Sequence, residues 1–145
     1  MSMGVSFKLE DLRPHLGQVA MYLMLGMIIG FLYFQKIFPY FSSPVNAEMP
    51  TLLFVLFLIS IGAVSGYLYP DITNVLASAI LLPLLGGLFC FLIFISPTLS
   101  RDIMASGLGE DLVLLARLLL FDMLMSFLVI FVAGFGSVYL FESAE

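Results

Sequence analysis

Residues 51–95 read TLLFVLFLISIGAVSGYLY-PD-ITNVLASAILLPLLGGLFCFLIFI. Two uncharged, apolar runs flank a proline–aspartate pair. Each run reaches the roughly 20 residues that an α-helix needs to cross a hydrocarbon core about 30 Å thick. Because Pro70 and Asp71 leave room only for a tight turn, the stretch predicts two antiparallel transmembrane helices. Asp71 or Asn74 is expected to cap the second of them.

Two further apolar runs lie outside this pair, one on each side. Together the four runs predict an all-α integral membrane protein, folded as a bundle of four transmembrane helices. The expected spans are about 17–34, 51–69, 72–95 and 111–141. They use most of the 145 residues, so residues 17–145 are expected to form a single domain.

Residues 1–16 form a more polar N-terminal tail. Phe7, Leu9, Leu12 and Leu16 fall close to one helical face, with charged residues between them. This pattern is typical of a short helix lying in the membrane interface. Pro14 is expected to break or restart that helix, because proline lacks the backbone N–H that continues it.

The composition excludes several classes of function. Hydrophobic residues make up 62% of the chain and charged residues 10%, with a net charge of −5 and no basic cluster, which argues against nucleic-acid binding. One histidine, His15, and one cysteine, Cys90, lie in different regions, so no metal site and no cofactor are expected. No set of nucleophile, base and metal ligands converges, so the chain is not expected to be an enzyme.

A short motif recurs near the ends of the first two spans. Residues 26–33 read GMIIGFLY and residues 62–69 read GAVSGYLY, an offset of 36 positions. Two glycines four residues apart leave a groove in which another helix backbone can approach closely. The repeat is compatible with a diverged duplication, as in pseudo-symmetric transporters; convergent use of a packing motif is favoured, since spans three and four repeat it poorly. Gly26, Gly30, Gly62 and Gly66 are the candidate helix-packing residues.

The third span carries a proline in its middle, followed by two glycines. Pro83 removes one backbone hydrogen bond, and Gly86 and Gly87 weaken the next turn. These residues predict a helix kink.

Arg117 and Asp122 are the two charges embedded in the last apolar run. Charges inside a membrane helix cost at least about 2.5–3.5 kcal/mol near mid-bilayer, which makes them candidate functional residues. Being five positions apart, they point to different faces of one helix and are not expected to pair. Arg117 is expected to extend towards the headgroups. Asp122 has three interpretations: a carboxyl group satisfied within the fold, a contact to a partner, or a proton- or cation-coupled carboxylate.

The favoured function is a non-catalytic accessory or scaffold subunit of a larger membrane complex, assembled through small-residue helix faces. Its expected partners are the lipid bilayer and other membrane-protein subunits, with a hetero-complex favoured over a homo-oligomer. The alternative is a small oligomeric proton- or cation-coupled transporter or channel that uses Asp122. An even number of spans puts both termini on the same side of the membrane. Basic residues are almost evenly divided between the two sides and do not assign the orientation.

Overall fold

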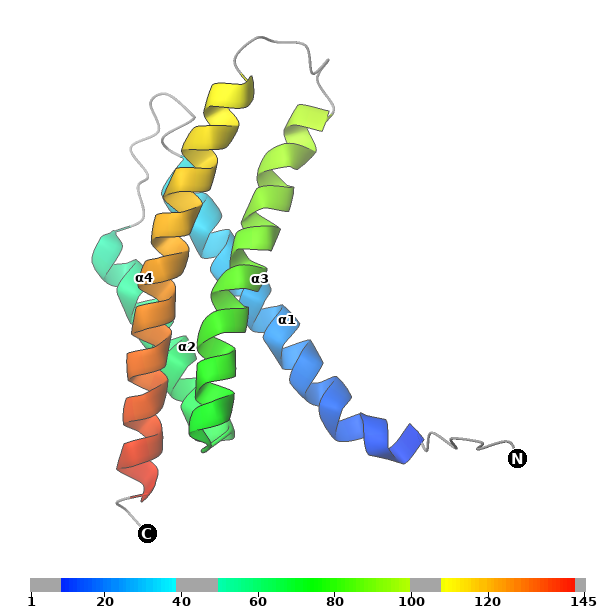
Figure 1. Ribbon diagram of the computed structural model, residues 1–145, viewed down its shortest axis with the longest axis vertical. Helices are drawn as coiled ribbons and strands as arrows, with labels where there is room; N and C mark the ends of the chain where they lie inside the picture. The colour runs from blue at the N-terminus through cyan, green and yellow to red at the C-terminus, as the bar shows by residue number, and fades with distance from the viewer. Residues whose placement is uncertain (1–8, 39–49, 100–107, 143–145) are drawn as a thin grey trace.

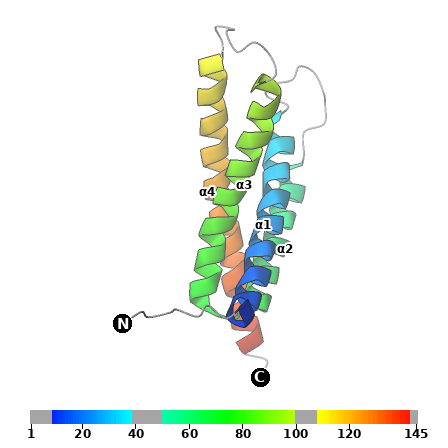
Figure 2. The same ribbon diagram turned by 90° about the vertical axis from the view of Figure 1, so that its right-hand side faces the viewer.

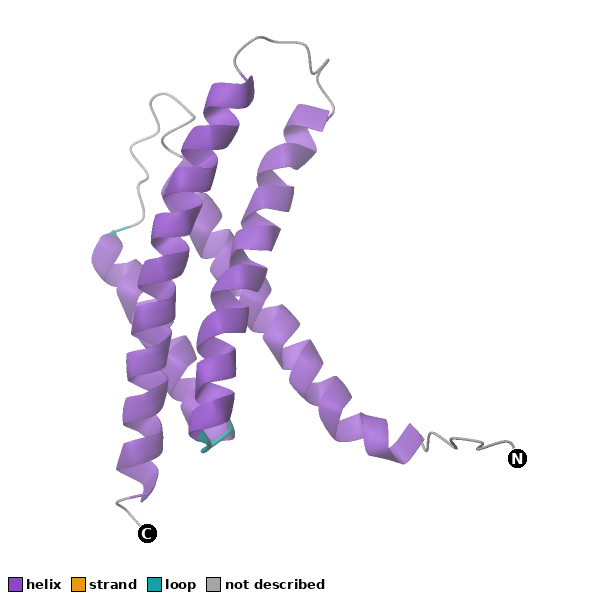
Figure 3. Ribbon diagram, viewed as in Figure 1, coloured by secondary structure: helices purple, strands orange, loops and turns teal. Residues whose placement is uncertain are grey.

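The computed structural model describes residues 9–38, 50–99 and 108–142, and all of the regular structure in these ranges is helical. The chain runs up and down through four helices (Figures 1 and 3). Their bounds are α1 Leu9–Ile37, α2 Thr51–Leu68, α3 Ile72–Leu99 and α4 Leu108–Glu142. Each helix contains a stretch long and apolar enough to cross a membrane: Leu16–Ile37, Thr51–Leu68, Ile72–Ser96 and Leu112–Leu140.

The first membrane-length helix begins within the predicted N-terminal tail, before the expected start of the first span at about residue 17. Residues 1–8 of the expected tail lie outside the described residues, but α1 starts at Leu9 and continues through Pro14 into the first span. The predicted break at Pro14 is therefore wrong. Proline costs the helix one backbone bond at this position, and the turns on either side remain helical.

The predicted tight turn between the second and third spans is present. Leu68 ends α2 and Ile72 begins α3. The Asp71 carboxylate accepts a hydrogen bond from the backbone N–H of Thr73 at 3.1 Å. This bond satisfies one of the free N–H groups at the start of α3, so Asp71 is the capping residue.

Neighbours in the sequence are not the main partners in space. Helix α1 packs chiefly against α3, and α2 packs chiefly against α4, while α3 and α4 contact each other across the centre. Helices α1 and α3 run in the same direction, and α2 and α4 both run in the opposite one (Figure 1). The bundle is thus two parallel helix pairs placed side by side.

Helix α1 leaves the bundle along its N-terminal half. Figure 2 shows its upper half beside α3, whereas Figure 1 shows its lower half diverging from the other helices. The side chains of Leu16, Val19 and Met24 are accordingly exposed. The apolar core is concentrated where the upper half of α1 meets the other three helices.

Candidate functional site

The buried carboxylate of Asp122 on α4 is neutralised by a lysine of α1. Lys36, one residue before the end of α1, donates a hydrogen bond from Nζ to Oδ1 of Asp122 and forms an ion pair with it. The Asp122 side chain is only 5% exposed, whereas that of Lys36 is 23% exposed. Of the three interpretations of Asp122, this contact corresponds to the first, a carboxyl group whose charge and hydrogen bond are satisfied within the fold.

The pair lies inside the apolar length of α4 but at the end of α1. Asp122 is ten residues after Leu112, where the apolar stretch of α4 begins, which is about 15 Å along the helix axis at 1.5 Å per residue. Helix α1 reaches this level only with its last turn. A lysine ending a short span therefore meets an aspartate inside a longer one.

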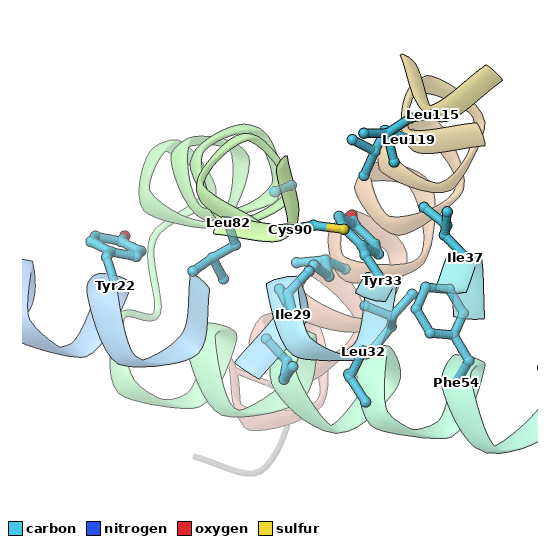
Figure 4. Packing of buried hydrophobic residues seen from close by; sticks show 14 residues of the cluster. Tyr22, Ile29, Leu32, Tyr33, Ile37, Phe54, Leu82, Cys90, Leu115 and Leu119 are labelled. Carbon is cyan, nitrogen blue, oxygen red and sulfur yellow. The ribbon is translucent and has the colours of Figure 1, made fainter. Parts of the chain in front are cut away.

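Aromatic and hydroxyl side chains surround the pair. The Lys36 Nζ lies 4.7 Å from the centroid of the Phe54 ring on α2. The Tyr33 ring lies 6.0 Å, centroid to centroid, from the Phe54 ring. The Tyr33 hydroxyl lies beside the Ser126 hydroxyl on α4, and Asp122 on α4 and the buried Cys90 on α3 are near enough to act on it electrostatically. Figure 4 shows Tyr33, Phe54 and Cys90 converging from three helices.

Two buried hydroxyl groups of this cluster, those of Tyr33 and Ser126, make no hydrogen bond of standard geometry among the described residues. Both residues are fully buried, and the two hydroxyls lie close enough to pair with each other. Buried polar groups are usually satisfied, and an unsatisfied one costs about 1–3 kcal/mol. Elsewhere in the bundle a tyrosine hydroxyl is paired: Tyr22 on α1 shares a hydrogen bond of 2.9 Å with Ser78 on α3. The cluster around Lys36 and Asp122 is therefore unusual in this molecule.

The glycines of α1 form the crossing with α3. A Cβ atom added to Gly26 would lie 2.7 Å from the Cβ of Leu85. One added to Gly30 would lie 2.7 Å from the Cβ of Phe89 and 2.9 Å from the carbonyl oxygen of Gly86. No side chain fits at these separations without movement, so the two backbones depend on glycine here.

The glycines of α2 form the crossing with α4 in the same way. A Cβ atom on Gly62 would lie 2.9 Å from the Cβ of Ala133. One on Gly66 would overlap the Ser137 hydroxyl and the carbonyl oxygen of Gly134. The Ser137 hydroxyl donates to the Gly134 carbonyl at 2.9 Å, so its own helix satisfies it and it can face the crossing.

The two crossings share one register. The contacts between α1 and α3 correspond to those between α2 and α4. Each α1 residue corresponds to the α2 residue 36 positions later, and each α3 residue to the α4 residue 48 positions later. The same offset of 48 relates Asn74 to Asp122 and Ser78 to Ser126. The structure thus reveals a correspondence between spans three and four that the sequence analysis missed. The matched contacts are Gly26–Leu85 with Gly62–Ala133, Gly30–Gly86 with Gly66–Gly134, and Gly30–Phe89 with Gly66–Ser137.

The residues predicted to kink the third span lie within one continuous helix. Helix α3 runs unbroken through Pro83, which is buried. A Cβ on Gly86 would lie 2.5 Å from the Cγ2 of Ile29, and one on Gly87 would lie 2.7 Å from the sulfur of Met123. The two glycines therefore allow close contact with α1 on one side and α4 on the other.

Arg117 stands apart from the cluster. Arg117 lies on α4, five positions before Asp122, and is exposed. The structure brings Asp122 together with Lys36 and leaves Arg117 on the outer surface. Sequence reasoning did not select Lys36, Tyr33, Phe54 or Ser126 as site residues. A useful signal was present, since the predicted topology places the end of span one and the start of span four on the same side.

Comparison with known proteins adds no family to this description: the chain matches no family model, and no curated protein or solved structure is detectably similar to it. The class defined by the fold is an all-helical chain with four helices suited to crossing a membrane.

Proposed function

We propose that this chain is an integral, multi-pass membrane protein that acts as a non-catalytic accessory or scaffold subunit of a larger membrane complex. The observation that carries the proposal is the incomplete packing of α1. Its N-terminal half leaves the bundle (Figure 1), and it makes little contact with α2. A second membrane-embedded subunit beside α1 would complete the bundle.

The four candidate glycines do not provide the surface for this association. Gly26 and Gly30 are covered by α3, and Gly62 and Gly66 are covered by α4. The expected assembly through small-residue faces is therefore replaced by assembly through the outward face of α1. That face carries large apolar side chains, including Leu16, Met24 and Met27.

The test is the composition of the native particle, purified in mild detergent and measured by native mass spectrometry. Stoichiometric foreign subunits are expected. Met24→Asn on α1 should release them, and Leu120→Asn on α4 is the matched control, because both native side chains are 66% exposed. A particle that contains only this chain, as a monomer or a homo-oligomer, would contradict the proposal.

A second candidate is a small oligomeric proton- or cation-coupled transporter that uses Asp122. The observation that favours it is the pair of buried hydroxyls, those of Tyr33 and Ser126, near the carboxylate. Flux into proteoliposomes that contain the purified chain tests it, with Asp122→Asn expected to abolish transport. Equal flux for the wild type and the variant would exclude it.

A further inference from the structure

The ammonium group of Lys36 lies in an environment that is complementary to it on two sides. Asp122 accepts a hydrogen bond and supplies the opposite charge. The face of the Phe54 ring, 4.7 Å from Nζ, supplies the electron-rich surface that attracts cations. A carboxylate and an aromatic face together are a common way of recognising organic ammonium groups.

Two further acceptors lie beside this environment. An ammonium group has three N–H donors, and a hydroxyl oxygen can accept a hydrogen bond. The hydroxyls of Tyr33 and Ser126 are fully buried near Asp122 and lie beside each other, and neither makes a hydrogen bond of standard geometry among the described residues. The cluster therefore offers more acceptor capacity than Lys36 uses.

The cation is the more accessible member of the pair. The Lys36 side chain is 23% exposed, while that of Asp122 is 5% exposed. Lysine at the end of a membrane helix can extend its charge towards the interface. Lys36 can thus withdraw while Asp122, Tyr33, Phe54 and Ser126 stay in place.

The geometry points to a binding site for a primary ammonium group, formed by Asp122, Phe54, Tyr33 and Ser126 and occupied in the free protein by the chain's own Lys36. An external ammonium group competes with Lys36 for the carboxylate. This inference is independent of the proposed subunit function, because it concerns the interior of the chain and not the outward face of α1.

A primary ammonium group has two sources in a membrane: a soluble alkylamine and the headgroup of an aminophospholipid. A groove of about 480 Å³ between α1 and α2 is lined in part by Gln35, which precedes Lys36 in the chain. Its other lining residues are apolar and include Phe31 of α1 and Phe57 of α2. A groove of this chemistry accepts an acyl chain, so an aminophospholipid is tested beside a soluble amine.

The first experiment uses chemical rescue of the full-length chain in phosphatidylglycerol nanodiscs. Lys36→Ala removes a group the size of propylammonium. Propylammonium chloride should raise the Tm of K36A saturably and leave the K36A/D122N double variant unchanged. The apparent affinity of K36A should exceed that of the wild type at least tenfold. Sodium chloride and propanol control for ionic strength and for the apolar part of the probe.

The second experiment needs no variant, so it remains informative if K36A fails to fold. The chain contains two lysines, Lys8 and Lys36. With ¹⁵N-lysine, the Lys36 ammonium resonance should shift when propylammonium is added, or when phosphatidylethanolamine replaces part of the nanodisc lipid. Lys8 is the internal control.

The outcomes are distinct. A response to propylammonium alone identifies a soluble amine as the source, and a response to phosphatidylethanolamine alone identifies the lipid headgroup; either one supports the site. No response of the Lys36 resonance to either source, or equal rescue of K36A and K36A/D122N, would overturn the inference and leave a purely structural ion pair.

Discussion

Lys36 and Asp122 are separated by 86 positions in the chain, yet they form a single ion pair that fastens the end of α1 to the interior of α4. Removing one partner of a buried pair leaves the other charge without compensation, which typically costs about 3–5 kcal/mol. Because the Lys36 side chain is 23% exposed, the cost is expected at or just below the lower end of that range. Lys36→Met and Asp122→Asn should therefore each destabilise the bundle by about 2–3 kcal/mol, as measured by unfolding in mixed detergent micelles.

The double variant K36M/D122N is the control for this prediction. It contains no unpaired charge and should recover most of the lost stability. If its destabilisation equals the sum of the two single variants, the residues do not interact in the folded protein.

The glycine crossings predict that the effect of a glycine-to-alanine substitution on stability depends strongly on its position. Gly30→Ala should destabilise the bundle by about 1–3 kcal/mol, because the added Cβ meets the backbone of α3. Gly136→Ala on α4 meets nothing within 4 Å and should be neutral, or stabilising by up to about 1 kcal/mol through helix propensity. Unfolding of both variants under one set of conditions checks the contrast, and equal effects would show that α1 does not contact α3 at Gly30.

The two buried tyrosines should respond differently to loss of the hydroxyl. Tyr22→Phe removes the hydrogen bond to Ser78 and should cost about 0.5–1.5 kcal/mol. Tyr33→Phe removes a hydroxyl that makes no hydrogen bond of standard geometry within the described part of the chain, and it should be neutral or stabilising by about 1 kcal/mol. The difference in Tm between the two variants is the measurement. A larger loss for Tyr33→Phe would reveal a partner of that hydroxyl in the assembled protein.

Cys90 provides a probe of the core without any substitution. It is the one cysteine of the chain. It lies where α3 packs against α1 and α4, and it is only 1% exposed. A maleimide should label it at least tenfold more slowly in the folded protein than after unfolding in dodecyl sulfate, since the reagent needs an accessible thiolate. Fast labelling of the folded protein would place Cys90 on the surface.

The helical class and the four apolar runs could be predicted from the sequence, because a membrane span is a local property of about 20 residues. The helix ends were less predictable. Leu9 begins α1 although Pro14 follows it, since the apolar pattern gives no sign that a helix will continue through a proline.

Long-range pairing was beyond local reasoning. The spacing of Gly26 and Gly30 marks a helix face but does not identify α3 as the helix that covers it. The apolar residues of the spans surround each helix, so no hydrophobic stripe indicates a neighbour. The partner of Asp122 was hidden for the same reason, because only the packing of α1 brings Lys36 to it.

The alternating pairing of the helices has a consequence for biosynthesis. Helices leave the ribosome in sequence order, so the glycine face of α1 cannot be covered before α3 is made, and that of α2 cannot be covered before α4 is made. Until α4 is synthesised, the glycine face of α2 has no partner and Asp122 has not yet arrived to neutralise Lys36. A nascent chain interrupted after α3 is therefore expected to expose both features to quality-control proteases, which makes the last helix the step that completes maturation.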